Sequence, residues 1–223
     1  MRRDESVQVR SRNAVTDQDL ETLLQRGYQS HGIEFKGPGK RTDSAFLSKV
    51  IRAVIGMANR REGGVVVIGV DSDTLVPIGL EDDQADTWSY DHLATSVNGY
   101  ASPSVSFDLE TKRYQGRKLI IIQVHEFADI PILCRKDYQS NTGTKPTLIL
   151  RRGACYVRSR HKPETSEIPS EEEMRELLEL AVDKGVEKFV ARARKAGLFP
   201  GGQAVPASPD DKERFKEQIE DLE

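Results

Sequence analysis

The chain has 223 residues, of which 37% are hydrophobic, and it carries a formal net charge of -3. This composition suffices for one domain with a buried core plus tails, and the small net charge excludes a general attraction to nucleic acid or membranes, so that any polyanion contact needs a local basic face. The two cysteines stand far apart, the chain starts without a secretory hydrophobic segment, and no apolar run reaches membrane-spanning length, so we expect a reduced, cytoplasmic protein without membrane contact.

The chain begins with a basic segment. Residues 1–15 contain four arginines and no apolar period, and we expect a flexible basic arm there. A helix is predicted to start at Thr16, with leucines on one face, and to stop at Gly27. The folded domain is expected to extend over residues 16–196.

A strand, a helix and a second strand are predicted next. The first strand covers Ile33–Lys36, and the helix, capped by Thr42 or Asp43, extends to Asn59. The second strand covers Val65–Val70, whose continuous apolar run is typical of a strand that is buried on both faces. Such a crossover makes the two strands parallel neighbours.

The middle of the chain is predicted to contain an acidic loop, a short helix and a hairpin. The acids lie in residues 81–86, and the helix covers about Tyr90–Tyr100. Two strands, residues 105–110 and 118–124, flank a turn with Gly116 and therefore favour a β-hairpin.

Three more strands are expected at residues 131–135, 147–151 and 155–159, with a polar loop at residues 140–146. A long helix starts at Ser170 and can continue past Gly185 to Lys195. Its predicted core-facing residues are Met174, Leu177, Leu178, Ala181 and Val182.

The last 27 residues, 197–223, are predicted to be a linker followed by a short amphipathic helix with Phe215, Ile219 and Leu222 on one side. That helix is either frayed or docked on a partner or second copy. The fold class is therefore α/β: a mixed sheet with a strand-helix-strand crossover, a β-hairpin and a long C-terminal helix.

Two carboxylates stand out. Glu34 and Lys36 lie two apart on a strand and therefore point to the same face, while Asp71 follows the end of the second strand. Because the two strands are neighbours, Glu34 and Asp71 are expected to approach each other. The alternative is a simple ion pair between Glu34 and Lys36 and a turn that begins at Asp71.

The segment Gly37–Thr42 connects a strand to a helix and contains Lys40 and Arg41. It fails the P-loop pattern, because Arg41 stands where Ser or Thr belongs and Glu34 where the first glycine belongs, so ATP hydrolysis is not expected. Backbone N–H groups at a helix start beside two cations would still suit a phosphate of a nucleic acid. The alternative is a plain turn.

Further basic residues cluster near the ends of the predicted elements. If they converge, they form a positive groove toward Glu34 and Asp71, as recognition of a nucleic-acid backbone requires; otherwise they are solvated strand ends. Tyr156 either stacks on a base or packs in the core. With Lys40 and Arg41, the candidate nucleic-acid-binding residues are Arg60, Arg61, Arg151, Arg152, Arg158, Arg160 and Lys162.

Several motifs follow one another in an order that resembles the Schlafen/AlbA-type domain family, over about Thr16 to Ala181. The run from Gly153 to Ser159 is also similar to the closing strand of that family. The earlier motifs are Gly27-Tyr28-Gln29-Ser30, Ile33-Glu34-Phe35-Lys36, Ala58-Asn59 with Gly63-Gly64, Ile68-Gly69-Val70-Asp71 and Ile78-Gly79-Leu80.

The resemblance implies nucleic-acid chemistry. Some members resemble metal-dependent endoribonucleases in which three acids hold divalent cations, and many prokaryotic members are described only as nucleic-acid-binding or ATP-binding domains. Two of these acids map onto Glu34 and Asp71, which would bind Mg²⁺ or Mn²⁺, while Lys36 would neutralise charge on the scissile phosphate. The third acid stands five residues before Glu34, where this chain has Gln29.

Gln29 weakens the expected metal site, because its amide oxygen lacks the negative charge that hard cations prefer. Three explanations are open: a natural protein without nuclease activity, a natural variant that recruits another acid such as Asp43 or Asp73, or an engineered inactive form.

The predicted function is that of a Schlafen-like protein that binds RNA or DNA and has an endonuclease-type site of Glu34, Asp71, Lys36 and Gln29. The alternative is a non-catalytic nucleic-acid-binding or assembly subunit of a larger complex. In either case a homodimer or a larger complex is expected.

Overall fold

The computed structural model describes residues 21, 32–141, 145–158 and 164–198. The chain divides into two compact units, Met1–Lys184 and Gly185–Glu223. The predicted basic arm, the helix predicted from Thr16 and the C-terminal amphipathic segment lie outside the described residues, apart from Glu21.

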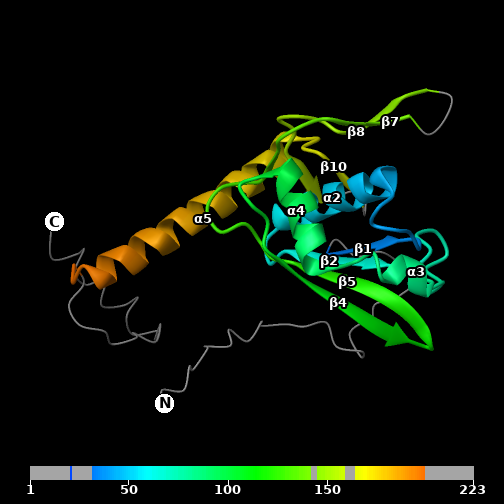
Figure 1. Cartoon of the computed structure of the whole chain (residues 1–223). Coiled ribbons are helices and arrows are strands. Elements are labelled where there is room, and N and C mark those ends of the chain that lie inside the picture. The colour runs from blue at the N-terminus through cyan, green and yellow to red at the C-terminus, as the bar shows by residue number, and fades with distance from the viewer. Residues whose placement is uncertain (1–20, 22–31, 142–144, 159–163, 199–223) are drawn as a thin grey trace, which may run out of the picture. The chain divides into compact units, whose positions relative to one another are not determined.

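A four-stranded sheet forms the centre of the first unit, in the order β1-β2-β5-β4. β1 (Ile33–Lys36) is parallel to β2 (Gly64–Ile68), and β5 (Arg117–Val124) is antiparallel to both β2 and β4 (Phe107–Tyr114). Helix α2 (Ser44–Ala58) connects β1 to β2. The mixed α/β sheet with its crossover and hairpin is therefore confirmed (Figure 1).

Helix α2 begins and covers the sheet as the sequence predicts. The Asp43 side chain accepts hydrogen bonds from the backbone N–H groups of Ala45 and Phe46, at 2.9 and 3.1 Å, which satisfies two of the donors at the helix start. Its apolar face packs on the sheet and is buried together with Val66 and Ile68 of β2. Burial of this face, rather than helix propensity, holds α2 in place.

The sheet has apolar side chains on both faces, because its strands alternate between them. Val66, Ile68, Ile120 and Ile122 belong to the large core that includes α2 and α4 (Tyr90–Tyr100). The opposite face has a second, smaller buried cluster. That cluster comprises Ile33, Phe35, Val65, Val67, Val70, Leu119 and Ile121.

The β4–β5 hairpin turns at Gln115 and Gly116, whose φ angles are +49° and +77°. Two successive positive φ values are the signature of a type I′ turn, whose twist matches that of the flanking strands. Only glycine adopts this conformation without strain, which explains why Gly116 occupies the second position.

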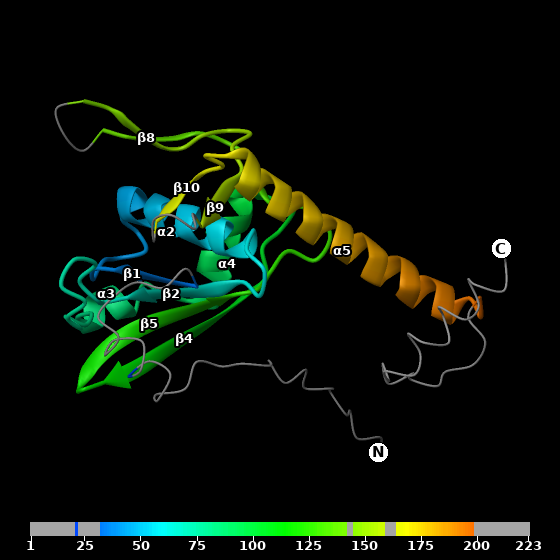
Figure 2. The same cartoon turned by 180° about the vertical axis from the view of Figure 1, so that it is seen from behind.

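Shorter elements complete the first unit. β7 and β8 form a hairpin that projects away from the sheet in both views (Figures 1 and 2), and β9 pairs with β10 beside α2. Their bounds are α3 Asp82–Ala85, β3 Ala101–Ser102, β6 Leu133–Cys134, β7 Tyr138–Ser140, β8 Thr147–Leu150, β9 Tyr156–Arg158 and β10 Thr165–Glu167.

Some of these short elements differ from the prediction. Part of the acidic loop forms the single helical turn α3, because Glu81 and Gln84 make a reciprocal capping box. Ser140 was expected in a polar loop, but it ends β7 and is buried. β3, β7 and β10 are two or three residues long, too short for any periodicity to reveal them.

Helix α5 (Glu171–Lys195) has the predicted extent but a different buried face. Leu177 and Leu180 are buried, whereas Met174, Leu178 and Val182 are exposed, so that their predicted orientation toward the core was wrong. Successive residues are about 100° apart around a helix, so Leu178 cannot share the buried side of both Leu177 and Leu180. Among the described helices, none is both long and apolar enough to cross a membrane.

Candidate functional site

Strand β1 directs Glu34 and Lys36 to the sheet face that α2 covers. Phe35, between them, joins the cluster on the other face, as the period of two requires. The Lys36 ammonium lies 2.5 Å from Glu34 Oε1. β1 is an edge strand among the described strands, so both side chains lie at a border of the sheet.

The Glu34 carboxylate is buried and has further partners. Its Oε2 accepts hydrogen bonds from Arg158 Nη1 at 2.7 Å and from Thr165 Oγ1 at 2.8 Å. Arg158 Nη2 also donates to the carbonyl oxygen of Ile33, at 2.7 Å. Burial lowers the pKa of the Arg158 guanidinium from its ordinary value, and the negative charge of Glu34 partly offsets this. The cluster of Glu34, Lys36, Arg158 and Thr165 therefore joins β1 to β9 and β10.

A close approach between α2 and β10 places Thr165 within this cluster. A Cβ atom on Gly56 would lie 2.5 Å from Thr165 Cγ2, a distance that side chains do not tolerate. Gly56 therefore lets β10 come near enough to α2 for the Thr165 hydroxyl to reach Glu34.

Asp71 has local partners. Its Oδ1 accepts hydrogen bonds from Asp73 N at 3.0 Å, Thr74 N at 2.7 Å and Thr74 Oγ1 at 2.8 Å. These bonds lower the pKa of Asp71, because they stabilise its charged form; the bond from the Thr74 backbone N–H has the largest effect. In the β1–β2 register Glu34 lies opposite Val66, five residues before Asp71, and no described contact joins the two carboxylates.

The described residues include no group of three or more His, Cys, Asp or Glu side chains that could hold a metal ion. Both oxygens of Glu34 already bind cationic groups, and a divalent ion would meet the positive charges of Lys36 and Arg158. Gln29 lies outside the described residues, and Asp43 caps α2.

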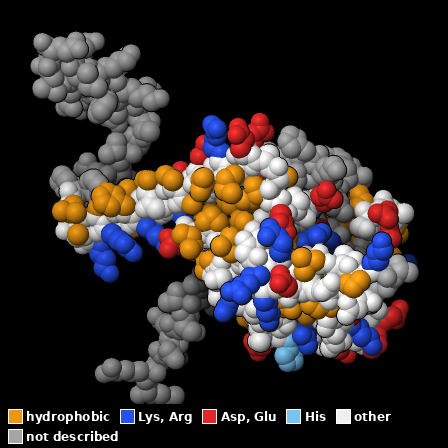
Figure 3. Space-filling view, turned by 90° about the horizontal axis from the view of Figure 1, so that it is seen from above, with side chains coloured by type: hydrophobic (Ala, Val, Ile, Leu, Met, Phe, Trp, Pro, Cys, Tyr) orange, Lys and Arg blue, Asp and Glu red, His pale blue; other side chains and the backbone are white. Residues whose placement is uncertain are grey.

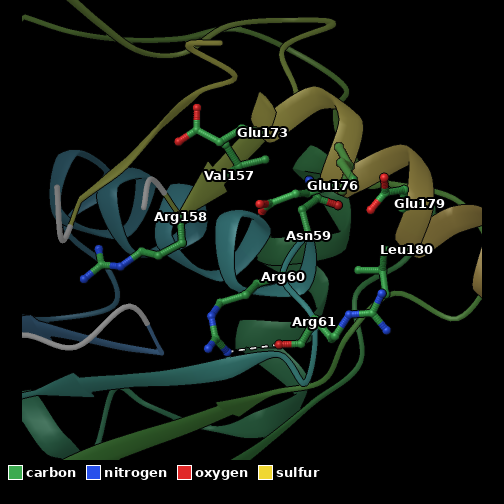
Figure 4. A pocket seen from close by; sticks show the side chains of 10 residues that line it. Asn59, Arg60, Arg61, Val157, Arg158, Glu173, Glu176, Glu179 and Leu180 are labelled. Carbon is green, nitrogen blue, oxygen red and sulfur yellow. Dashed lines mark hydrogen bonds between the residues drawn. The ribbon is translucent and has the colours of Figure 1, made fainter. Parts of the chain in front are cut away.

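Arg60, Arg61 and Arg158 come together at one cavity of about 700 Å³ (Figure 4). Arg60 and Arg61 follow the end of α2, and Arg158 belongs to β9. Glu173, Glu176 and Glu179 of α5 line the same cavity (Figure 4). The cavity therefore carries both positive and negative side chains; its other lining residues are Asn59, Val157, Leu177 and Leu180.

Two of the arginines at the cavity are held in different ways. Arg60 Nη1 donates to the carbonyl oxygens of Arg61 and Gly63, at 3.0 and 2.7 Å, and so stabilises the turn between α2 and β2. Arg61 is exposed and pairs with Asp183 of α5 at 2.6 Å. Exposed pairs of this kind exchange partners at little cost, so Arg61 is available to an anionic ligand.

Lys40 and Arg41 do not line this cavity. Lys40 pairs with Asp83 at 2.7 Å, and Arg41 Nε donates to the carbonyl oxygen of Thr87 at 2.8 Å. The Trp88 indole N–H donates to the carbonyl oxygen of Gly39 at 3.0 Å, and Trp88 itself is buried. The loop after β1 is thus attached to α3 and the segment that follows it.

The remaining basic candidates lie elsewhere. Arg151 forms a bidentate pair with Glu167 and lines a separate hollow of about 300 Å³. The backbone N–H of Arg152 donates to Asp137 Oδ1 at 2.7 Å. Arg160 and Lys162 lie outside the described residues. Tyr156 is buried, and its hydroxyl accepts a hydrogen bond from the backbone N–H of Arg151, so the packing alternative holds for Tyr156.

Asn59 and Thr165 are site residues that sequence reasoning missed. Asn59 is buried at the end of α2, where its amide donates to the carbonyl oxygens of Ile132 and Tyr156, both at 2.8 Å, and accepts from Ile132 N at 2.7 Å. An amide directly after an apolar helix was the available signal for Asn59. Thr165 gave none, because nothing in the sequence relates it to Glu34.

The family model described as Schlafen, AlbA_2 matches residues 29–187. The search of curated proteins returned no match. Among solved structures, the DIP2311 protein from Corynebacterium diphtheriae is 20% identical, with a TM-score of 0.40 over 58% of this chain and 25% of that chain. This chain therefore spans about a quarter of the DIP2311 protein.

A second solved structure is the N-terminal domain of a protein from Nitrosomonas europaea that is described as ATP-dependent DNA helicase RecG-related. It is 24% identical, with a TM-score of 0.42, and the match covers 70% of this chain and 97% of that domain.

Proposed function

Since the chain belongs to the Schlafen, AlbA_2 family, we propose that it binds RNA or DNA at the cavity between α2, β9 and α5. The observation that carries this proposal is that Arg60, Arg61 and Arg158 all line one cavity. Guanidinium groups bind phosphate through paired N–H donors and are the usual contacts to a nucleic-acid backbone.

The mixed charge of the cavity is compatible with phosphate binding. Arg158 has its charge compensated by Glu34, so it serves as a fixed part of the wall. Arg61 pairs with an exposed carboxylate, that of Asp183, which a phosphate group can replace. We therefore assign direct phosphate contact to Arg61 and, beside it, to Arg60.

We expect Arg61→Ala to weaken the binding of duplex DNA or structured RNA without unfolding the protein. Loss of one phosphate contact lowers the slope of log K against log salt by about 0.9 for a duplex. Fluorescence anisotropy at several salt concentrations measures this slope. The affinity itself is expected to fall by roughly tenfold at low salt.

Two variants control this experiment. Arg113→Ala removes an exposed arginine from β4, the opposite edge strand, and should leave both affinity and slope unchanged. Asp183→Asn removes the competing carboxylate and should strengthen binding. Absence of binding by the unmodified chain, or equal losses in Arg61→Ala and Arg113→Ala, would contradict the proposal.

A second candidate function is metal-dependent endonuclease activity. It is favoured by Glu34 and Lys36, an acid and a lysine in contact on the strand beside the cavity, at the positions that the family resemblance assigns to the reaction. Mg²⁺ or Mn²⁺ would be held by Glu34 and Asp71 with an acid at position 29, and it would supply an activated water and charge stabilisation at the phosphate. Lys36 would neutralise charge on the scissile phosphate.

The activity is tested with three forms of the chain: unmodified, Gln29→Glu and Glu34→Ala. Each is incubated with structured RNA and with single-stranded DNA in Mn²⁺, with and without EDTA, and cleavage, binding and melting temperature are measured together. We expect cleavage by Gln29→Glu alone, because an added carboxylate increases affinity for a hard cation.

Other outcomes separate the candidate functions. Binding without cleavage by all three forms would support a non-catalytic nucleic-acid-binding subunit. If cleavage continues in EDTA and in the Glu34→Ala variant, neither Glu34 nor a metal ion is needed for the reaction. If Glu34→Ala melts below the assay temperature, its inactivity is due to unfolding. Such a loss of stability would follow because the buried Arg158 lacks its partner.

A further inference from the structure

Helix α5 carries a row of exposed apolar side chains. Their exposed fractions lie between 42% and 65%, and Figure 3 shows hydrophobic side chains following the helix. We call this row the α5 stripe; it consists of Met174, Leu178, Val182, Val186 and Phe189.

The stripe lies on one side of the helix, since its members are four, four, four and three residues apart. Leu177 and Leu180, which are buried, lie on another side. Monomeric proteins scatter single apolar residues over their surface, whereas a contiguous apolar row marks an interaction surface.

The charges of α5 are divided between its two halves. Residues 171–180 contain five acids and one arginine, while residues 184–195 contain five cations and one acid. The helix dipole favours this order only in the first and last turns. Charged residues also lie further inside the helix: Glu176 and Glu179 line the cavity with Arg60 and Arg61, and Lys184 pairs with Glu126 at 2.5 Å.

We propose that α5 pairs in antiparallel orientation with α5 of a second copy of this chain, with the two-fold axis at Val182. The stripe is centred on Val182, so that Leu178 of one copy lies opposite Val186 of the other. Antiparallel pairing brings each acidic half beside a basic half, whereas parallel pairing would place like charges together. One self-complementary surface then serves both copies, as a two-fold interface requires.

The oligomeric state of the full chain tests this pairing. Light scattering after gel filtration should give a dimer for the unmodified chain. Leu178→Asp should raise the dimer dissociation constant by at least about tenfold, because a carboxylate would be buried between two apolar stripes. Ile130→Asp is the matched control, since Ile130 is 57% exposed and Leu178 is 55% exposed, and it should remain dimeric.

Cysteine cross-linking tests the orientation. In the Val182→Cys variant, the introduced cysteines of the two chains should form a disulfide with each other under mild oxidation. Met174→Cys should not, since antiparallel pairing about Val182 separates its two copies by 16 residues, or about 24 Å along the axis. The unmodified chain, with its native Cys134 and Cys155, is the background.

Three results would overturn the pairing. The first is an unmodified chain that stays monomeric up to its solubility limit. The second is cross-linking of Met174→Cys as efficient as that of Val182→Cys, which indicates parallel helices. The third is a full-length chain that is monomeric while a shortened chain, ending at Pro209, is dimeric. In that case residues 210–223 of the same chain would cover the α5 stripe.

Discussion

Arg158→Ala is expected to destabilise the protein by about 3–5 kcal/mol, because it leaves the Glu34 carboxylate buried with one of its two cationic partners removed. The substitution also removes the hydrogen bond to the carbonyl oxygen of Ile33. In a domain of this size the loss corresponds to a fall in melting temperature on the order of 10 °C. Thermal unfolding followed by circular dichroism measures it.

Two further variants establish that the cause is the buried charge. Arg151→Ala breaks an exposed bidentate pair with Glu167 and should change the melting temperature little, because solvent screens that pair. The double variant Glu34→Leu with Arg158→Met replaces the pair by apolar side chains and should recover most of the stability. An equal loss in Arg151→Ala and Arg158→Ala, or no recovery in the double variant, would refute this account.

Asn59→Ala should destabilise the protein by a similar amount, about 3–5 kcal/mol, because it leaves three buried backbone groups without partners. These groups belong to Ile132 and Tyr156, so the end of α2 would lose its attachment to two separate segments. Urea titration measures this loss as a lower free energy of unfolding, with the slope of the transition unchanged.

Ser48→Ala is the matched control for Asn59→Ala. Ser48 is also buried on α2, but its hydroxyl donates only to the carbonyl oxygen of Ala45 within the same helix. Its loss should cost less than about 1 kcal/mol. If Ser48→Ala and Asn59→Ala lose the same stability, the hydrogen bonds of Asn59 do not explain its effect.

The Asn59 and Arg158 predictions bear on the candidate site as well as on stability. Asn59 and Arg158 both line the cavity, and each binds the backbone of a neighbouring segment. Arg61, by contrast, is exposed and pairs with the exposed Asp183. The site therefore combines a rigid wall, which Asn59 and Arg158 build, with an arginine that can exchange its partner for a ligand.

Long elements were predictable because each has a periodic or capped pattern. A cap at Thr42 or Asp43 predicted the start of α2, the unbroken apolar run predicted β2, and Gly116 predicted the β4–β5 turn. The orientation of α5 was not predictable, because Leu177 and Leu178 are equally apolar. Only the shape of the surface on which a helix docks selects which of its apolar sides is buried.

The sequence by itself determined the α/β class, the crossover, the family and the shared face of Glu34 and Lys36, because all of these depend on local periodicity and on motifs that are contiguous along the chain. The tertiary structure decided that Arg158 and Thr165 complete the environment of Glu34, and that α5 carboxylates share the cavity with Arg60 and Arg61. Those contacts join residues more than 100 positions apart, and burial and charge compensation act on distance in space rather than on distance along the chain.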